Sequence, residues 1–237
     1  MGRPVRDISV KGRVIYIKNH DASTKQANEA IDSLSSCGWD VKLTPGYTPE
    51  TVQTSNYNFD ILPNGRLSCF EGRKFFTKKA CVMNHIALWN EVITLDEPIA
   101  FFEHDAIGIK APNFDLIREQ VKDFCFLSMD YAFDWGALAG KFSWRPKPSL
   151  VDEIRDFPKN YPLKHHRMCM YKDADLPPGV AAYVVTPKGA KKLIAAATNF
   201  GLEQADYLVN SFNVRMQYYA SSVCKYNTVN LNTSGAK

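Results

Sequence analysis

The sequence predicts an α/β fold, in which a mostly parallel sheet is flanked by helices within a single domain. Short β-branched apolar runs alternate with stretches of helical periodicity, the pattern of β-α-β units. The apolar run at 98–106, opened by a proline, is typical of a strand buried on both faces. No repeat and no composition break marks a linker, so residues 1–237 are expected to form one domain with a polar tail from about residue 227.

Composition narrows the class of protein. The hydrophobic content of 45% and the charged content of 23% are ordinary for a globular protein. A net charge of +4 does not demand a nucleic-acid partner, although it permits a polyanionic one. The six cysteines form no C-x-x-C pair, which argues against a zinc ribbon and for reduced thiols. Without a signal peptide or a transmembrane run, the sequence predicts a cytoplasmic protein, in the host cytoplasm if it is viral.

The N-terminal third predicts a β-α-β unit. Residues 14–17 form a β-branched run, and 39–43 form a second strand. Between them, Ser23 and Gln26 suggest a capping box for a helix that ends at Gly38. A right-handed crossover should make the two strands parallel. The turn after the first strand has no glycine-rich phosphate fingerprint, so a dinucleotide or P-loop site is unsupported.

The next part is irregular and then helical. Residues 47–76 lack periodicity, and a helix with two apolar stripes is predicted from Thr77. His85 falls among these apolar positions, where a lone histidine is more often a structural core residue than a ligand. Basic side chains gather where the segment meets the helix, forming either a solvated surface or a phosphate site: Arg66, Arg73, Lys74, Lys78 and Lys79.

The run at 98–106 is the stretch around which the rest of the chain is organised. It ends in Glu103, His104 and Asp105. In an extended chain Glu103 and Asp105 project to the same side, and ligands collect beyond the carboxyl ends of such strands. The two carboxylates are suited to a divalent cation that neutralises a phosphate. The alternative is a solvated turn whose acids cap the next helix.

The C-terminal half predicts further alternation. Asn113 should cap a helix, and 124–129 reads as a buried strand. Residues 131–178 are aromatic and proline-rich, and they suit sugar or base stacking or a self-packed lid. A strand at 179–186 leads into a helix at 187–201, whose first residue is proline.

Three motifs in order resemble those of the family 25 glycosyltransferases, which include lipopolysaccharide-type sugar transferases and collagen hydroxylysine galactosyltransferases. They are ACVMNHIALW at 80–89, FFEHDA at 101–106 and GVAAYVVTPKGAKKL at 179–193. The family shows a Gly-Cys-x-x-Ser-His helix and a Glu-Asp-Asp after the strand. This chain departs from it at Ala80, Asn84 and His104. Replacement of the central aspartate by His104 removes one carboxylate from the acidic motif, and imidazole favours softer ions than magnesium.

The resemblance implies a GT-A-like, Rossmann-type fold and an enzyme that moves a hexosyl or pentosyl group from a nucleoside diphosphate sugar, with a UDP-sugar as first choice, to an acceptor hydroxyl. It implies Mn²⁺ or Mg²⁺ at Asp105 and Glu103. For an inverting reaction the general base would be Asp206, with Asp130 second and the pair His165 and His166 as outside candidates. The remaining donor-binding candidates that it implies are Asn19, Lys79, Asn84, His85, Glu103 and Lys188.

Two alternatives stay open. Beside the main expectation of a glycan, lipid-linked or other hydroxyl acceptor, one alternative is a modified base of DNA, as in glycosyltransferases of viral type, whose binding would depend on salt. The other is a non-catalytic relative that binds nucleotide sugars, given the altered acidic motif. A methyltransferase is more distant, because the first β-α turn lacks the expected glycines.

Overall fold

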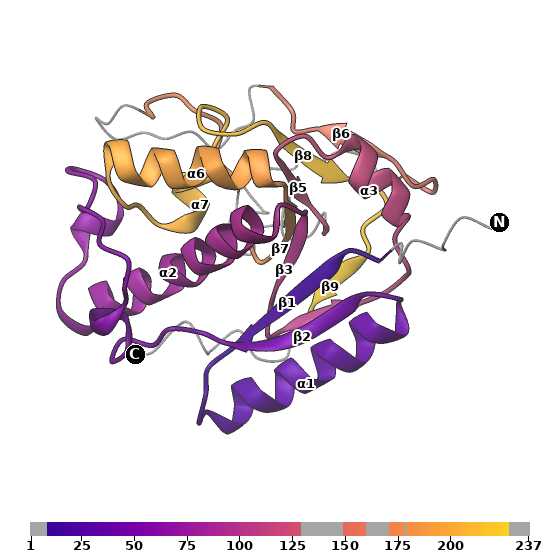
Figure 1. Ribbon diagram of the computed structural model, residues 1–237, viewed down its shortest axis with the longest axis horizontal. Helices are drawn as coiled ribbons and strands as arrows, with labels where there is room; N and C mark the ends of the chain where they lie inside the picture. The colour runs from indigo at the N-terminus through magenta and orange to yellow at the C-terminus, as the bar shows by residue number, and fades with distance from the viewer. Residues whose placement is uncertain (1–8, 129–148, 160–170, 178, 228–237) are drawn as a thin grey trace, which may run out of the picture.

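A seven-stranded sheet lies at the centre of the protein, in the order β2-β1-β3-β7-β5-β8-β6 (Figure 1). The computed structural model describes residues 9–128, 149–159, 171–177 and 179–227. The strands of this sheet are β1 (Lys11–Tyr16), β2 (Asp40–Pro45), β3 (Ile99–Glu103), β5 (Phe124–Phe126), β6 (Ile154–Asp156), β7 (Ala182–Val185) and β8 (Met216–Tyr219). A second sheet pairs β4 (Ala106–Gly108) with β9 (Cys224–Tyr226).

Most strands of the large sheet run in the same direction, as predicted. β1 is parallel to β2 and to β3, and β5 is parallel to β8. β7 lies antiparallel between β3 and β5, and β6 is antiparallel to β8. Therefore β1, β2, β3, β5 and β8 share one direction, and only β6 and β7 oppose it. The predicted parallel β-α-β unit at the N-terminus is confirmed.

Helices cover both faces of the sheet (Figure 1). One face packs against α2 and α6, and the other packs against α1 and α3, so two hydrophobic clusters sandwich the strands. The helices are α1 (Asp21–Ser36), α2 (Gly72–Leu95), α3 (Phe114–Gln120), α6 (Pro187–Phe200) and α7 (Ala205–Leu208), with 3-10 turns η1 (Val52–Thr54) and η2 (Leu67–Cys69). As predicted, Asn113 caps α3, and its Oδ1 accepts a hydrogen bond from the Leu116 amide at 3.0 Å.

Strand β3 is buried on both faces, as its continuous apolar run predicts. Phe101 belongs to the cluster under α2 and α6, and Phe102 belongs to the cluster under α1. Both are 2% exposed or less. On the α1 side, the ring of Trp39 meets that of Phe102 edge to face at 5.2 Å between centroids. Alternate residues of one strand therefore anchor the two halves of the core.

The start of α1 differs from the prediction. The N-cap is His20, whose Nδ1 accepts a hydrogen bond from the Ser23 amide at 3.2 Å. The Ser23 hydroxyl instead accepts a hydrogen bond from the Ile17 amide at 2.9 Å, which ties the helix to the end of β1. The capping box from Ser23 to Gln26 is therefore wrong, because the serine is used for a contact outside the helix.

Helix α2 begins at Gly72, five residues before the predicted start at Thr77. The basic run in its first turns opposes the helix dipole, which makes an early start unfavourable by local criteria. Phe75 and Phe76 nevertheless pack against the main hydrophobic cluster. Tertiary burial of these two rings outweighs the local electrostatic cost.

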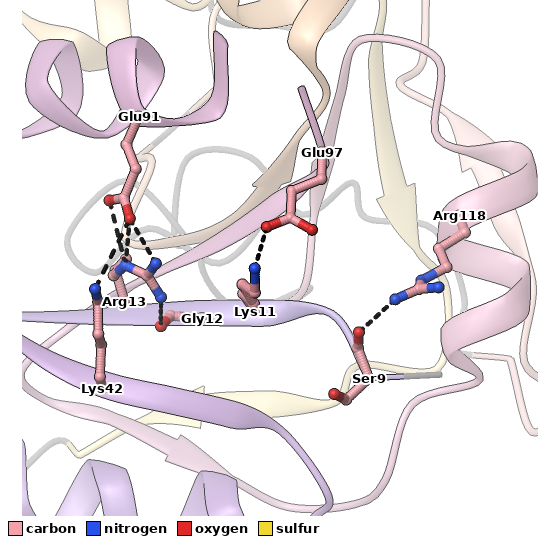
Figure 2. Close-up of polar contacts among 8 residues, drawn as sticks. All are labelled: Ser9, Lys11, Gly12, Arg13, Lys42, Glu91, Glu97 and Arg118. Atoms are coloured by element: carbon pink, nitrogen blue, oxygen red, sulfur yellow. Dashed lines mark hydrogen bonds and ion pairs between the residues drawn. The ribbon is translucent and has the colours of Figure 1, made fainter. Parts of the chain in front are cut away.

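Ion pairs fix α2 against the sheet (Figure 2). The buried Arg13 of β1 pairs with Glu91 of α2, with an Nη2–Oε1 distance of 2.5 Å, and its Nη1 donates to the Gly12 carbonyl at 2.8 Å. Lys11 pairs with Glu97 at 2.5 Å, just before β3 begins. Because the C-terminal end of α2 is held beside the start of β1, its N-terminal end reaches the opposite edge of the sheet.

Some predictions fall on residues outside the described ranges. Most of the aromatic segment at 131–178 lies there, as does nearly all of the predicted polar tail. The cysteines within the described ranges are free thiols. No described helix has both the length and the apolar character needed to cross a bilayer.

Candidate active site

The candidate site lies at the edge of the sheet where β1, β2 and β3 end together. These strands are parallel, so their carboxyl ends meet there. Glu103 is the last residue of β3, and Asn19 follows β1 in a left-handed conformation with φ of 62°. Ligands of open α/β sheets bind at this kind of edge.

Three carboxylates from two segments, the end of β3 with its following turn and α7, interact electrostatically at this edge. Burial and then the charges of Asp105 and Asp206 raise the pKa of Glu103 to about 8, and Lys78 opposes the shift. Burial likewise raises the pKa of Asp206, while Lys78 and Arg66 act to lower it. Thus the structure brings together Glu103, Asp105 and Asp206, all of which the sequence reasoning had selected.

The local geometry of the acidic motif differs from the expected extended chain. β3 ends at Glu103, and His104 and Asp105 form a turn before β4. The argument that Glu103 and Asp105 project to one side of a continuing strand is therefore wrong. The carboxylates come together because the chain turns, and the Asp105 carbonyl accepts a hydrogen bond from the Asn227 amide at 2.8 Å.

Basic side chains from η2 and the start of α2 face the carboxylates. Lys78 interacts with both Glu103 and Asp206, and Arg66 interacts with Asp206. Arg66 also lies over the ring of Phe70, with its Cζ 5.3 Å from the centroid, and Lys74 lies over the same ring at 5.1 Å. Of the five cations predicted as either a solvated surface or a phosphate site, Lys78 and Arg66 border the acidic cluster, whereas Arg73 pairs with Glu50 at 3.4 Å.

Glu203 connects the two segments that carry Arg66 and Asp206. Its side chain is fully buried, and its carboxylate accepts hydrogen bonds from the amides of Leu67 and Gln204, each at 2.7 Å, and from the amide of Arg66. Gly65 lies so close to this carboxylate that a Cβ there would be 2.3 Å from Oε2. Sequence reasoning missed Glu203, because nothing in its neighbourhood distinguishes it from an exposed acid.

Cys81 of α2 lies near enough to Glu103 and Asp206 to feel their charges. Its side chain is exposed, yet desolvation and the charges of Glu103 and Asp206 raise the pKa of its thiol to about 11. Thiolate is the nucleophilic form of cysteine. The raised pKa of this thiol disfavours its thiolate form at neutral pH.

His85 lies in the core beneath the site. It is 4% exposed, and its Nδ1 lies 2.8 Å from the hydroxyl of Tyr183, which also accepts a hydrogen bond from Trp89 Nε1 at 3.1 Å. Burial lowers the pKa of His85 to about 3, so the ring is neutral. The Tyr183 hydroxyl thus joins the imidazole of His85 and the indole of Trp89 in one buried hydrogen-bonded group. These contacts agree with the interpretation of His85 as a structural core residue.

The other predicted donor-binding residues are scattered. Asn84 uses its Oδ1 to accept a hydrogen bond from the Tyr47 amide at 2.6 Å, so it holds the loop after β2. Lys79 follows Lys78 in α2, and successive side chains of a helix point in different directions. Lys188 lies in the first turn of α6, after β7 ends beside the start of β3, and is therefore at the opposite edge of the sheet. Three further catalytic candidates lie outside the described residues: Asp130, His165 and His166.

The donor atoms at the site suit a hard cation. Among the described residues, no three His, Cys, Asp or Glu side chains gather closely enough to form a metal site. Mg²⁺, however, is usually held by one or two carboxylates together with water and substrate phosphates. Glu103 and Asp105 are two such carboxylates, and burial first, then the charges of Asp105 and Asp206, disfavour ionisation of Glu103.

Comparison with known protein families agrees with this geometry. Residues 16–209 match the family described as glycosyltransferase family 25 (LPS biosynthesis protein), which is more than half of the chain. A search of curated proteins gives no match. The match includes β3, the acidic turn, α2 and the segment that carries Asp206, and the α/β sheet is consistent with a Rossmann-like GT-A fold. The chain therefore belongs to glycosyltransferase family 25.

Proposed function

We propose that the protein transfers a sugar from a nucleoside diphosphate sugar to an acceptor hydroxyl at the edge of the sheet where β3 ends. The observation that carries this proposal is the convergence of Glu103, Asp105 and Asp206, bordered by Lys78 and Arg66. Acids that hold a cation, cations that face a diphosphate and a carboxylate that takes a proton are the groups this reaction needs.

The acid pair Glu103 and Asp105 would hold Mn²⁺ or Mg²⁺. When bound, the cation would offset the negative charge that grows on the departing diphosphate. The support comes from charge. Burial and the nearby charges of Asp105 and Asp206 make ionisation of Glu103 unfavourable, and a cation would favour it. Because both ligands must be deprotonated, cation binding should strengthen from pH 6 to pH 8.

Asp206 is the proposed general base of an inverting reaction. It lies in the first turn of α7, and burial raises its pKa, which makes its carboxylate a better proton acceptor than an exposed aspartate. The charges of Lys78 and Arg66 oppose this shift and act to lower the pKa of Asp206. Glu203 holds the Arg66 segment beside it through backbone hydrogen bonds.

The residues that we propose to contact the sugar donor lie at the edge of the sheet where β3 ends. Asn19 follows β1 and is exposed, and Lys78 and Lys79 lie near the beginning of α2. These groups are suited to the ribose and the diphosphate of a UDP-sugar. Lys188, at the far edge, has no part in this proposal.

The test is a thermal-shift panel of nucleoside diphosphate sugars with and without Mn²⁺, followed by measurement of released nucleoside diphosphate. A ligand that binds the folded state raises the melting temperature. Asp105→Asn should abolish the Mn²⁺-dependent shift and the turnover. Asp32→Asn, an exposed aspartate of α1, is the matched control and should change neither.

Two outcomes would redirect the proposal. Full turnover of Asp105→Asn, or full turnover of the native chain in chelator, would remove the metal role. Donor binding without hydrolysis or transfer to any hydroxyl acceptor would instead support a non-catalytic, nucleotide-sugar-binding protein.

A further inference from the structure

A basic groove lies at the edge of the sheet opposite the candidate active site. Its volume is about 640 Å³, and it is formed by the start of α6, the end of α3 with the following loop, and the turn before β3. Asp96 is the acid that lines it within the described residues. The basic side chains that line it are Arg118, Lys122, Lys188, Lys191 and Lys192.

The lysines of α6 are placed unfavourably for the helix itself. Lys188, Lys191 and Lys192 are spaced three and four residues apart, so they share one face, and all three are exposed. Like charges at this spacing, and cations in the first turns of a helix, each destabilise it slightly. Only Lys192 has a clear structural role, since it pairs with the buried carboxylate of Asp123. The charge of the other two is available to a partner.

The other cations enlarge the same surface from outside α6. Lys122 is exposed, and its Nζ donates a long hydrogen bond of 3.3 Å to the Glu119 carbonyl. Arg118 donates to the Ser9 carbonyl at 2.6 Å, which places the start of the described chain beside the groove (Figure 2). Residues far apart in sequence thus build one cationic surface.

Large apolar side chains adjoin this surface. Leu95, next to Asp96 at the end of α2, is 44% exposed, and Phe212 is 61% exposed. Phe212 lines a neighbouring cavity of about 400 Å³ that shares Lys192 with the groove. Exposed leucine and phenylalanine beside lysines are typical of surfaces that lie on a bilayer, where the apolar groups enter the headgroup region and the amines meet lipid phosphates. Duplex nucleic acid accommodates inserted apolar side chains mainly where base steps are kinked or unstacked.

We propose that this surface, the basic groove with Leu95 and Phe212, docks the protein on a membrane rich in anionic phospholipid. The contact is peripheral: cations attract the charged headgroups, and the two apolar side chains insert between them. Because the groove and Glu103 lie at opposite edges of the sheet, docking leaves the candidate active site open to solvent. This inference does not depend on the proposed transferase activity.

The test is co-sedimentation with phosphatidylcholine vesicles that contain or lack phosphatidylglycerol. The full-length protein should bind the anionic vesicles, and its affinity should fall as salt rises. Lys122→Gln/Lys191→Gln should weaken this binding roughly tenfold to thirtyfold, given the usual contribution of two cations at an anionic surface. The control Lys25→Gln/Lys225→Gln removes the same charge from exposed positions on α1 and β9 and should bind as the native protein does.

The apolar part is tested with Leu95→Ser/Phe212→Ser. This variant should bind anionic vesicles more weakly at every salt concentration while keeping the salt dependence of the native protein. Equal binding to both kinds of vesicle, an equal loss in the Lys25/Lys225 control, or tighter binding to duplex DNA than to anionic vesicles would each overturn the proposal.

Discussion

The carboxylate of Glu203 offers a sharp test of how the candidate active site is assembled. It is buried and accepts hydrogen bonds from the amides of Arg66, Leu67 and Gln204. In Glu203→Gln the side chain keeps its shape, but an amide NH₂ replaces the oxygen that faces the Arg66 amide. Two donors then face each other in a buried place.

The magnitude follows from the hydrogen bond that is lost. A hydrogen bond to a charged acceptor contributes about 1.5–3 kcal/mol, and a buried donor left unpaired costs a similar amount. We expect Glu203→Gln to lower the free energy of unfolding by about 2–3 kcal/mol. For a chain of this size that corresponds to a melting temperature lower by roughly 4–12 °C. Glu203→Ala leaves all three amides without their acceptor and should lower the free energy of unfolding further.

Urea denaturation and amide hydrogen exchange measure this effect together. The loss of protection should be largest at Arg66 and Leu67, because their amides lose their acceptor, and turnover should fall because Arg66 no longer lies fixed beside Asp206. Glu29→Gln, an exposed glutamate of α1, is the matched control. An unchanged urea midpoint for Glu203→Gln, or unchanged exchange at Arg66, would refute the reasoning.

Three further predictions concern other parts of the molecule. Burial lowers the pKa of His85 to about 3, so between pH 6.5 and pH 3 the unfolded chain takes up a proton that the folded chain does not. The free energy of unfolding should therefore fall with acidification by up to about 1.4 kcal/mol per pH unit. Urea melts at pH 7 and pH 5 should show a smaller drop in His85→Gln than in the native protein, and an identical drop would disprove the prediction. Gly189→Ala should destabilise by roughly 1–3 kcal/mol or more, because the new Cβ would lie 2.1 Å from the carbonyl oxygen of Asp123, and a melting temperature within error of the native value would contradict this. Asp206→Asn should spare donor binding and lower kcat by roughly 10²-fold or more if this carboxylate is the base, and unchanged turnover would exclude it.

Much of the N-terminal half was predictable because its signals are local. The β-branched run of β1, the periodicity of α1 and the apolar run of β3 are each contained within one short stretch of sequence. The parallel pairing of β1 and β2 follows from the crossover. The position of Glu103 and Asp105 at a ligand edge was predictable for the same reason, because they follow a buried strand, although the turn that they form was not.

The arrangement of the C-terminal half was not predictable. The strand at 179–186 was expected, but nothing in its sequence shows that β7 runs antiparallel between β3 and β5. The partners of Glu203 at Arg66 and Leu67 lie 137 and 136 residues away in the chain. Contacts over such separations depend on how whole elements pack, and no local pattern records them.

By itself, then, the sequence determined the strands β1, β2, β3, β5 and β7 and the helices α1, α2, α3 and α6, that β3 is buried on both faces, and that Glu103 and Asp105 lie where a strand ends. It predicted none of β4, β6, β8, β9 and α7. Only the tertiary structure decided that Asp206 joins these acids, that Glu203 holds Arg66 beside them, and that Lys188 lies at the far edge of the sheet. The physical reason is one of range. Burial patterns and turn chemistry act between neighbours in the chain, whereas the electrostatics of a site depend on which distant side chains share a desolvated space.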